Sequence, residues 1–253
     1  MNYIGLYTLI KQEVERFMRV VIQTLITPWV SAVLYIFVFG SILGSRIDTI
    51  EGVRYISFVL PGVLMMNVLS SAFAQSSSSL YFQRFTKNIE ERLVAPLSYA
   101  EMVIGYLVGA VVRAVVIGIG IMIIGIAFNA VSMYSFPLFM FYIVGVSIIF
   151  GLIGLLVALW ANNFEQLSLL NTFVIMPLSF IGGMFNSVKM LPSYLQTIAW
   201  FNPFLYFNDG IRYSMTGYHE TNIVAGMSMI ILLSVLLFAL IWHLFSIGWK
   251  LRV

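Results

Sequence analysis

Long, uninterrupted stretches of apolar residues recur six times along this 253-residue chain. They fall at residues 20–43, 56–80, 103–127, 136–160, 167–185 and 223–245. Each is long enough to cross the hydrocarbon layer of a bilayer, roughly 30 Å thick, as an α-helix. The continuous apolar character does not fit the alternating pattern of a membrane barrel. The sequence therefore predicts an all-α integral membrane protein with six transmembrane helices.

The composition supports one membrane domain over residues 1–253. Charged residues make up 9% of the chain and hydrophobic residues 61%, whereas a soluble domain has about 25% charged residues. The net charge of +3 is too small and too scattered to predict nucleic-acid binding. The chain has no cysteine, and its two histidines, His219 and His243, are far apart. Disulfides and thiolate metal sites are excluded, and we expect no metal or other cofactor.

Lysine and arginine in the short connections predict the orientation, because cytoplasmic loops are enriched in them. One side carries eight, which are Lys11, Arg16, Arg19, Arg84, Lys87, Arg92, Lys250 and Arg252. The other side carries four, which are Arg46, Arg54, Lys189 and Arg212. We therefore expect both termini on the cytoplasmic side.

The segment before the first span, residues 1–19, has the pattern of an amphipathic helix. Its apolar positions recur every three or four residues, and they are Ile4, Tyr7, Ile10, Val14, Phe17 and Val21. Polar residues take the opposite face, namely Thr8, Gln12, Glu15 and Arg19. This pattern predicts an interfacial helix on the cytoplasmic leaflet. A helix packed on a cytosolic partner fits it comparably well.

The connection between the second and third spans, residues 83–99, carries the densest charge in the chain. Asn88 and Glu91 have the spacing of a helix capping box, and Glu90 and Glu91 suit the first turn of a helix. Pro96 would end that helix. We predict a two-turn cytosolic helix over residues 88–95 that presents Leu93, rather than a passive hydrated turn.

The connection on the opposite side, residues 186–222, is too apolar for an aqueous loop. Pro192, Asn202 and Pro203 interrupt it. Two short helices that re-enter the membrane fit this segment best. Interfacial helices held by aromatic side chains are nearly as consistent with it.

Few polar residues lie within the predicted spans. Arg113 is the only basic one near mid-bilayer, and Gly105 and Gly109 precede it on the same helix face, which predicts close packing against another helix. Arg113 could face an internal path or bond to a neighbouring helix. The second span carries a polar flank of Asn67, Ser70, Ser71 and Gln75, which could serve either role.

Sequence motifs for catalysis or for binding a nucleotide phosphate are absent from the chain, and so are paired carboxylates within the spans. A proton- or ion-driven carrier would need such charges inside the membrane. We therefore expect any energy source to reside on another polypeptide, attached at residues 88–95.

Two motifs resemble those of the permease subunits of bacterial type-2 ABC exporters. The first is the sequence Glu-Arg-Leu-Val-Ala-Pro at residues 91–96, which is similar to the family's coupling helix and includes Glu91, Arg92, Leu93, Ala95 and Pro96. The second is the family signature, which here comprises Ile175, Leu178, Ile181, Gly182, Leu191, Pro192, Pro203, Phe204, Tyr206 and Arg212. Met184 departs from it, since a small or β-branched residue is usual there. The resemblance covers nearly the whole chain.

The resemblance implies a partnership in the bacterial cytoplasmic membrane. Two permease copies would associate with two cytosolic ATPase subunits, and they would export an amphiphilic or hydrophobic substrate such as a drug, a glycolipid or a lipid-linked saccharide. Membrane lipid would surround the pair. Two alternatives remain, a membrane anchor that transports nothing and an intramembrane enzyme that modifies lipid. The enzyme would need a buried acid and base, which the sequence does not offer.

Overall fold

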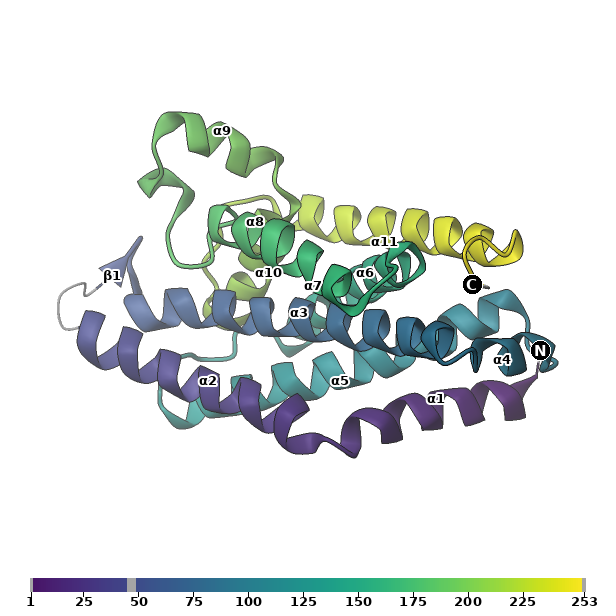
Figure 1. Cartoon of the computed structure of the whole chain (residues 1–253). Coiled ribbons are helices and arrows are strands. Elements are labelled where there is room, and N and C mark those ends of the chain that lie inside the picture. Colours follow the sequence, from purple (N-terminus) through teal and green to yellow (C-terminus); the bar gives the residue numbers. More distant parts are fainter. Residues whose placement is uncertain (1, 45–48, 252–253) are drawn as a thin grey trace.

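The structure is a computed structural model that describes residues 2–44 and 49–251. These residues form an elongated bundle of helices (Figure 1). Six of the described helices are long and apolar enough to cross a membrane. The predicted all-α class and its six spans are confirmed. Arg46 and Arg252, which contribute to the predicted orientation, lie outside the described residues.

Four of the spans are single helices, and the other two are each built from three consecutive helical segments. Span one consists of η1 (Ile22–Ile26), α2 (Thr27–Tyr35) and η2 (Ile36–Leu43), and span five of α7 (Phe164–Leu170), η3 (Asn171–Ile175) and α8 (Met176–Ile181). The others are α3 (Tyr55–Phe85), α5 (Tyr99–Ala127), α6 (Phe136–Trp160) and α11 (Ile223–Ser246). The helix α3 continues to Phe85, past the predicted end at residue 80. Hydropathy marks where a helix leaves lipid, whereas the hydrogen-bonded helix extends beyond that point.

The connecting segments are mostly short helices. They comprise α1 (Tyr3–Met18), α4 (Ile89–Val94), η4 (Val188–Met190), α9 (Ser193–Phe201) and α10 (Pro203–Thr216). A hairpin of β1 (Thr49–Ile50) and β2 (Val53–Arg54) was not expected from the sequence. Its two turn residues, Glu51 and Gly52, both have positive φ, as a two-residue hairpin turn requires.

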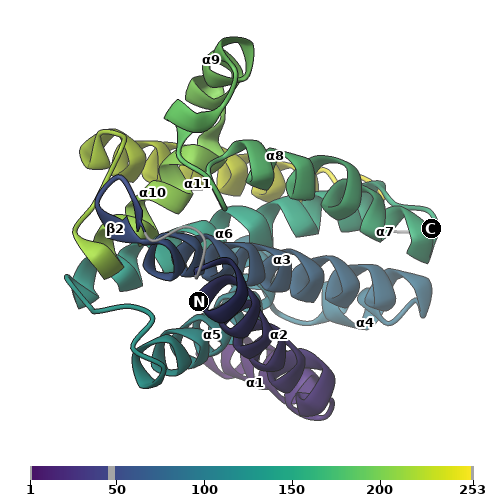
Figure 2. The ribbon, with the colours of Figure 1, turned by 90° about the vertical axis from the view of Figure 1, so that its left-hand side faces the viewer.

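The helices α3 and α6 form the centre of the bundle. Most of their residues are buried, and α5 and α10 pack against them. Spans one, five and six lie outside this centre and bury few of their own side chains. Figures 1 and 2 show α3 between α2 on one side and the α7–α8 segment on the other, with one face of α3 uncovered between them. The apolar outer spans leave large surfaces for lipid or for another chain.

The two ends of the bundle differ. The α1–α4 end holds α1, α4 and the C-terminal turn, and the opposite α9 end holds the hairpin, α9 and α10 (Figure 1). The helix α10 is largely buried, whereas α9 projects from the bundle in both views (Figures 1 and 2). The helix α1 runs alongside α5. Placement of α1 on the leaflet, and of α9 and α10 as re-entrant or interfacial helices, stays a prediction.

The predicted close packing of the glycine face of α5 is confirmed, and its partner is α1. A Cβ atom added at Gly105 would lie 2.3 Å from Leu9 Cδ2, and one added at Gly109 would lie 2.6 Å from Glu13 Cβ. Real Cβ atoms do not approach other atoms this closely. These two glycines therefore set the distance between α1 and α5.

We expect Gly109→Ala to lower the thermal midpoint of the purified protein, because the added methyl would push α1 away from α5. The matched control is Gly40→Ala, where the added Cβ would meet its nearest neighbour, Ile56 Cγ1, at 3.7 Å. That control should be neutral or stabilising, since alanine favours a helix over glycine by about 1 kcal/mol. Equal midpoints for the two variants would contradict the packing argument.

Candidate functional site

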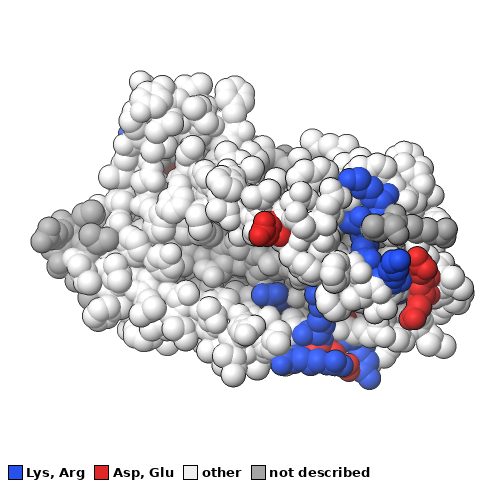
Figure 3. Space-filling view, viewed as in Figure 1, with Lys and Arg blue, Asp and Glu red and all other residues white. Residues whose placement is uncertain are grey.

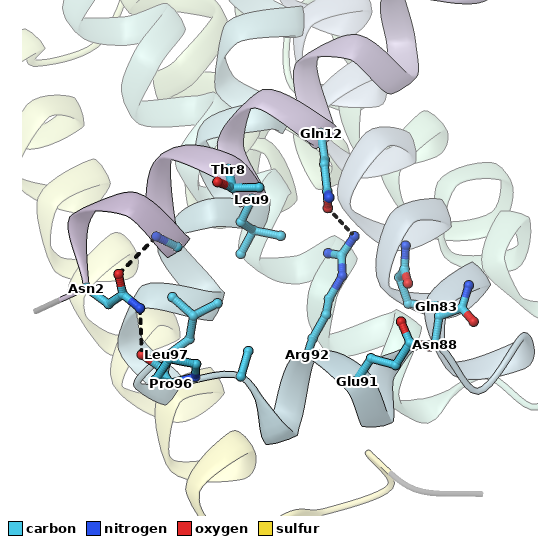
Figure 4. Close-up of a pocket in the computed structure, with 12 residues that line it drawn as sticks. Asn2, Thr8, Leu9, Gln12, Gln83, Asn88, Glu91, Arg92, Pro96 and Leu97 are labelled. Atoms are coloured by element: carbon cyan, nitrogen blue, oxygen red, sulfur yellow. Dashed lines mark hydrogen bonds between the residues drawn. The ribbon is translucent and has the colours of Figure 1, made fainter.

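A groove between α1 and α4 lies at the α1–α4 end, and Figure 4 shows the residues that line it. It encloses about 470 Å³. Its lining comes from α1, α4, the end of α3 and the connection between α4 and α5, and it comprises Asn2, Gly5, Thr8, Leu9, Gln12, Gln83, Asn88, Glu91, Arg92, Ala95, Pro96 and Leu97. Charged side chains gather at this end, while the rest of the face seen in Figure 3 is almost free of charge. Predicted residues of the coupling segment therefore meet α1 across one groove.

The cap of α4 differs from the prediction. Asn88 begins the helix but makes no side-chain capping hydrogen bond, so the predicted capping box of Asn88 and Glu91 is wrong. The capping box lies at the next helix, where the Ser98 hydroxyl accepts from the Glu101 backbone N–H and the Glu101 carboxylate accepts from the Ser98 N–H at 2.7 Å. A serine three residues before a glutamate is the sequence signal for this cap. A six-residue helix between two tight connections leaves Asn88 in a helical conformation that cannot cap.

The same Glu101 carboxylate also holds the start of α1. It accepts from the Asn2 backbone N–H at 2.7 Å, and the Asn2 side chain donates to the Pro96 carbonyl at 3.2 Å. Asn2 in turn caps α1 by accepting from the Gly5 N–H. The N-terminus of α1 is therefore fastened to the segment that joins α4 to α5. No sequence pattern indicated this contact, because it joins residues about a hundred positions apart.

A buried carboxylate ties α1 to α4 and α3. Glu13 is 1% exposed, accepts a 2.6 Å hydrogen bond from the Ser79 hydroxyl of α3, and lies 3.5 Å from Arg92 of α4. Arg92 also donates to Gln12 Oε1 at 3.3 Å and lies 5.2 Å above the Tyr106 ring of α5. Figure 4 shows Arg92 reaching from α4 toward α1. We call Glu13, Ser79, Arg92 and Tyr106 the Glu13 cluster; it joins four helices that are separate in sequence.

The side chains of α4 divide into an inward set and an outward set. Arg92 faces α1. Leu93 is half-buried against a cluster of apolar side chains from α3, α5, α6 and α11, so it is not the exposed apolar residue that the sequence predicts. Val94 takes that position and is 86% exposed, and Glu90 and Glu91 are exposed as well. Because α4 packs on the bundle along one side, the residue next to Leu93 is the one that points outward. The outward set of α4 is therefore Glu90, Glu91 and Val94.

The predicted path residues fall into two groups. Gln75 and Arg113 are brought together, since Arg113 Nη1 donates to Gln75 Oε1 at 3.0 Å, and the Gln75 amide donates to the Glu13 carbonyl at 3.4 Å. Both lie where α1, α3 and α5 meet, beside Arg16. Burial lowers the pKa of Arg16, and the Glu13 carboxylate opposes this change. This group extends the Glu13 cluster toward the middle of the bundle.

The second group lies on α3, with Asn67 and Ser70 on its uncovered face and Ser71 beside that face. Asn67 and Ser70 are half-buried; Asn67 donates to the Val63 carbonyl at 2.8 Å, and Ser70 donates to Asn171 of span five at 3.4 Å. Ser71 is buried, and its hydroxyl has no partner among the described residues. The uncovered polar face of α3 is thus flanked by spans one and five.

The family-signature residues gather at the α9 end. Arg212 is fully buried, donates to the Phe58 carbonyl at 3.2 Å and to the Gly183 carbonyl, and lies 3.8 Å from Asp209. Asp209, which the sequence analysis did not single out, accepts from the backbone N–H groups of Glu220 and Thr221. These contacts fasten α10 to α3, to the end of span five and to the start of span six.

The other signature residues shape the same region. Gly182 packs against Phe204, where an added Cβ would lie 2.8 Å from Phe204 Cβ. Pro192 and Pro203 stand at the starts of α9 and α10. The Leu191 carbonyl accepts from Gln196, and the Tyr206 hydroxyl donates to the Trp200 carbonyl at 3.1 Å. The structure brings these residues into one scaffold, separate from the groove between α1 and α4.

The fold and these two regions define a multi-pass helical membrane protein with a charged groove at one end and, at the other, a helix that buried hydrogen bonds hold in place. Its sequence matches the family described as "ABC-2 type transporter" over residues 5–216, and the chain belongs to this family. It is 34% identical over 250 residues to the inner membrane transport permease YadH of Escherichia coli K12, covering 99% of this chain and 98% of that protein.

Less similar relatives are nodulation proteins. Nodulation protein J of Rhizobium leguminosarum bv. viciae is 28% identical over 196 residues, covering 76% of this chain and 74% of that protein. Nodulation protein J of Rhizobium meliloti is 24% identical over 200 residues, covering 79% and 76%. The predicted family is confirmed, and the chain is a multi-pass helical member of it.

Proposed function

We propose that this chain is the permease subunit of an ATP-driven exporter that moves an amphiphilic or hydrophobic substrate outward across the cytoplasmic membrane. The observation that carries the proposal is the Glu13 cluster, which joins α1 and α4 to α3 and α5 at the charged end of the bundle. A force applied at this end would reach the spans through these contacts. A membrane anchor would have no use for such a connection.

The force would come from a separate ATPase, two copies of which would bind two permease copies. Glu90, Glu91 and Val94 form a small exposed surface with two charges and one apolar side chain, which suits contact with a partner. Arg92, which the sequence assigned to the ATPase contact, would instead pass the movement of α4 to α1 through Glu13. The α1–α4 end would then lie in the cytosol, with both termini.

The path would lie along the uncovered face of α3. Asn67 and Ser70 offer small polar groups there, and spans one and five flank them. A second copy of the chain would close this half-open face into a path between the two permeases. Because the face lacks rings of charge, an amphiphilic or hydrophobic substrate suits it better than an inorganic ion.

The proposal is tested by tagging the chain in its native host, solubilising it in detergent and assaying ATPase activity in the purified material. We expect an ATPase to co-purify in equal amount. The combined change of Glu90→Lys, Glu91→Lys and Val94→Asp should remove it without lowering the thermal midpoint, because all three side chains are exposed.

The matched control is Glu51→Lys, a charge reversal of an exposed residue at the α9 end, which should leave the ATPase bound. Recovery of the chain alone, with no ATPase in the wild-type preparation, would contradict the proposal. It would favour a membrane anchor or an intramembrane enzyme instead.

A further inference from the structure

A second charged cavity lies at the α1–α4 end, apart from the groove described above. It encloses about 190 Å³ between the end of α3 and the connection from α6 to α7. Its lining includes Arg84, Lys87 and Asn162, and no acidic residue among those described lines it. The cavity is therefore positively charged, and it lies where the membrane-spanning part of α3 ends.

Hydrogen bonds to backbone carbonyls hold the Arg84 side chain in place. It is 5% exposed, and its Nη1 donates to the Ala158 carbonyl and, at 3.3 Å, to the Ala161 carbonyl, which caps the end of α6. Its Nε is buried and has no partner among the described residues. Because two backbone carbonyls hold the guanidinium, its charge has a fixed position in the cavity wall, and this suits it to attract an oxyanion.

Lys87 is the second cation, and its backbone is strained. Its φ of 60° lies in the left-handed region, which a lysine rarely adopts. Within the described part of the chain its ammonium group has no ion pair or hydrogen bond. Glycine adopts this conformation without strain, so a change of Lys87 to glycine removes the side chain and its charge without disturbing the turn.

Aromatic rings stand beside this basic cavity. Tyr81 and Phe85 line it, and Phe164 packs edge-on against both, at 4.8 Å and 5.2 Å between ring centroids. Phe85 is 63% exposed and Phe164 is 50% exposed. Across the α6–α7 connection, Trp160 lines a cavity of about 530 Å³ with a wholly apolar wall. A ligand that combines an anionic group with a hydrocarbon chain matches these surroundings, whereas a free anion would use only the cations.

We infer that Arg84, Lys87 and Asn162 bind the phosphate group of an anionic amphiphile at the cytosolic face of the membrane. This inference rests on the proposed function for its biological meaning, since it makes an anionic, phosphate-bearing amphiphile the substrate class. The binding itself requires neither ATP nor the ATPase. It can therefore be measured independently of transport.

The test is equilibrium binding of dioctanoyl phosphatidic acid to the detergent-solubilised full chain, with any ATPase that co-purifies, and with dioctanoyl phosphatidylcholine as the neutral-headgroup comparison. Lys87→Gly should weaken phosphatidic acid binding by about fivefold, the effect of one basic residue near an anionic headgroup. Its thermal midpoint should not fall, because glycine relieves the left-handed strain. A loss of binding would then not reflect unfolding.

Lys11→Gln is the charge control, since the Lys11 side chain is 60% exposed at the same end and does not line the cavity. It should bind phosphatidic acid as the wild type does. Unchanged binding in Lys87→Gly, or an equal loss in Lys11→Gln, would overturn the inference. So would full displacement of the lipid by inorganic phosphate, which would assign the cavity to the free anion.

The result of the lipid-binding test can be distinguished from the result of the ATPase co-purification test. A fivefold loss in Lys87→Gly with no ATPase in any preparation would support the lipid site and reject the exporter. Loss of the ATPase from Lys87→Gly would assign Lys87 to the ATPase surface and overturn the lipid site, while the exporter would stand.

Discussion

Glu13→Gln should uncouple ATP hydrolysis from transport and lower the stability of the protein. The substitution keeps the shape of the side chain but removes the charge that faces Arg92 at 3.5 Å. Loss of one partner from a fully buried ion pair costs about 3–5 kcal/mol, and the cost here is smaller because the remaining partner, Arg92, is 16% exposed. We expect a lower thermal midpoint, together with loss of substrate-stimulated ATPase activity in proteoliposomes.

The control for this prediction is Glu15→Gln on the same helix. The Glu15 side chain is 49% exposed and pairs only with Lys11, at 3.8 Å, and such surface pairs contribute about 0–1 kcal/mol. The double variant Glu13→Gln with Arg92→Gln should recover part of the lost stability, since neither charge is then left alone. If Glu13→Gln behaves like Glu15→Gln, the Glu13 cluster does not connect the groove to the spans.

Arg212→Met should prevent most of the protein from reaching its folded form. Arg212 is fully buried, and it holds the Phe58 and Gly183 carbonyls and the Asp209 carboxylate. Its removal takes a donor from both carbonyls and leaves a buried carboxylate without its cation, which costs about 3–5 kcal/mol. Size-exclusion profiles of the detergent extract should show a small monodisperse fraction with a lowered thermal midpoint.

Lys189→Met provides the comparison, because Lys189 is a cation at the same end with a side chain 70% exposed, paired to Glu51 at 3.0 Å. It should change the midpoint little. Arg212→Lys should not restore the wild-type midpoint, since an ammonium cannot reproduce the fork of donors that a guanidinium supplies. A midpoint for Arg212→Met equal to that of Lys189→Met would show that the α9 end does not depend on this residue.

Several features of the protein were accessible from the sequence by itself. The six spans follow from apolar length, because the hydrocarbon layer sets how many residues a helix needs, and the ends at Phe136 and Trp160 agree with the predicted ones. The close approach at Gly105 and Gly109 follows from two small residues one turn apart on one face. The coupling-helix and signature motifs indicated the family, which the comparison with known families confirms.

Only the tertiary structure decided how the polar residues are used. Glu13 looks like an ordinary charge on an amphipathic helix, but packing buries it and brings Ser79 and Arg92, 66 and 79 positions away, to its carboxylate. Val94, not Leu93, is exposed because α4 lies on the bundle along one side. Local pattern specifies which residues prefer a helix or lipid; the partner of each polar group depends on which helices come together, and that is decided by packing over the whole chain.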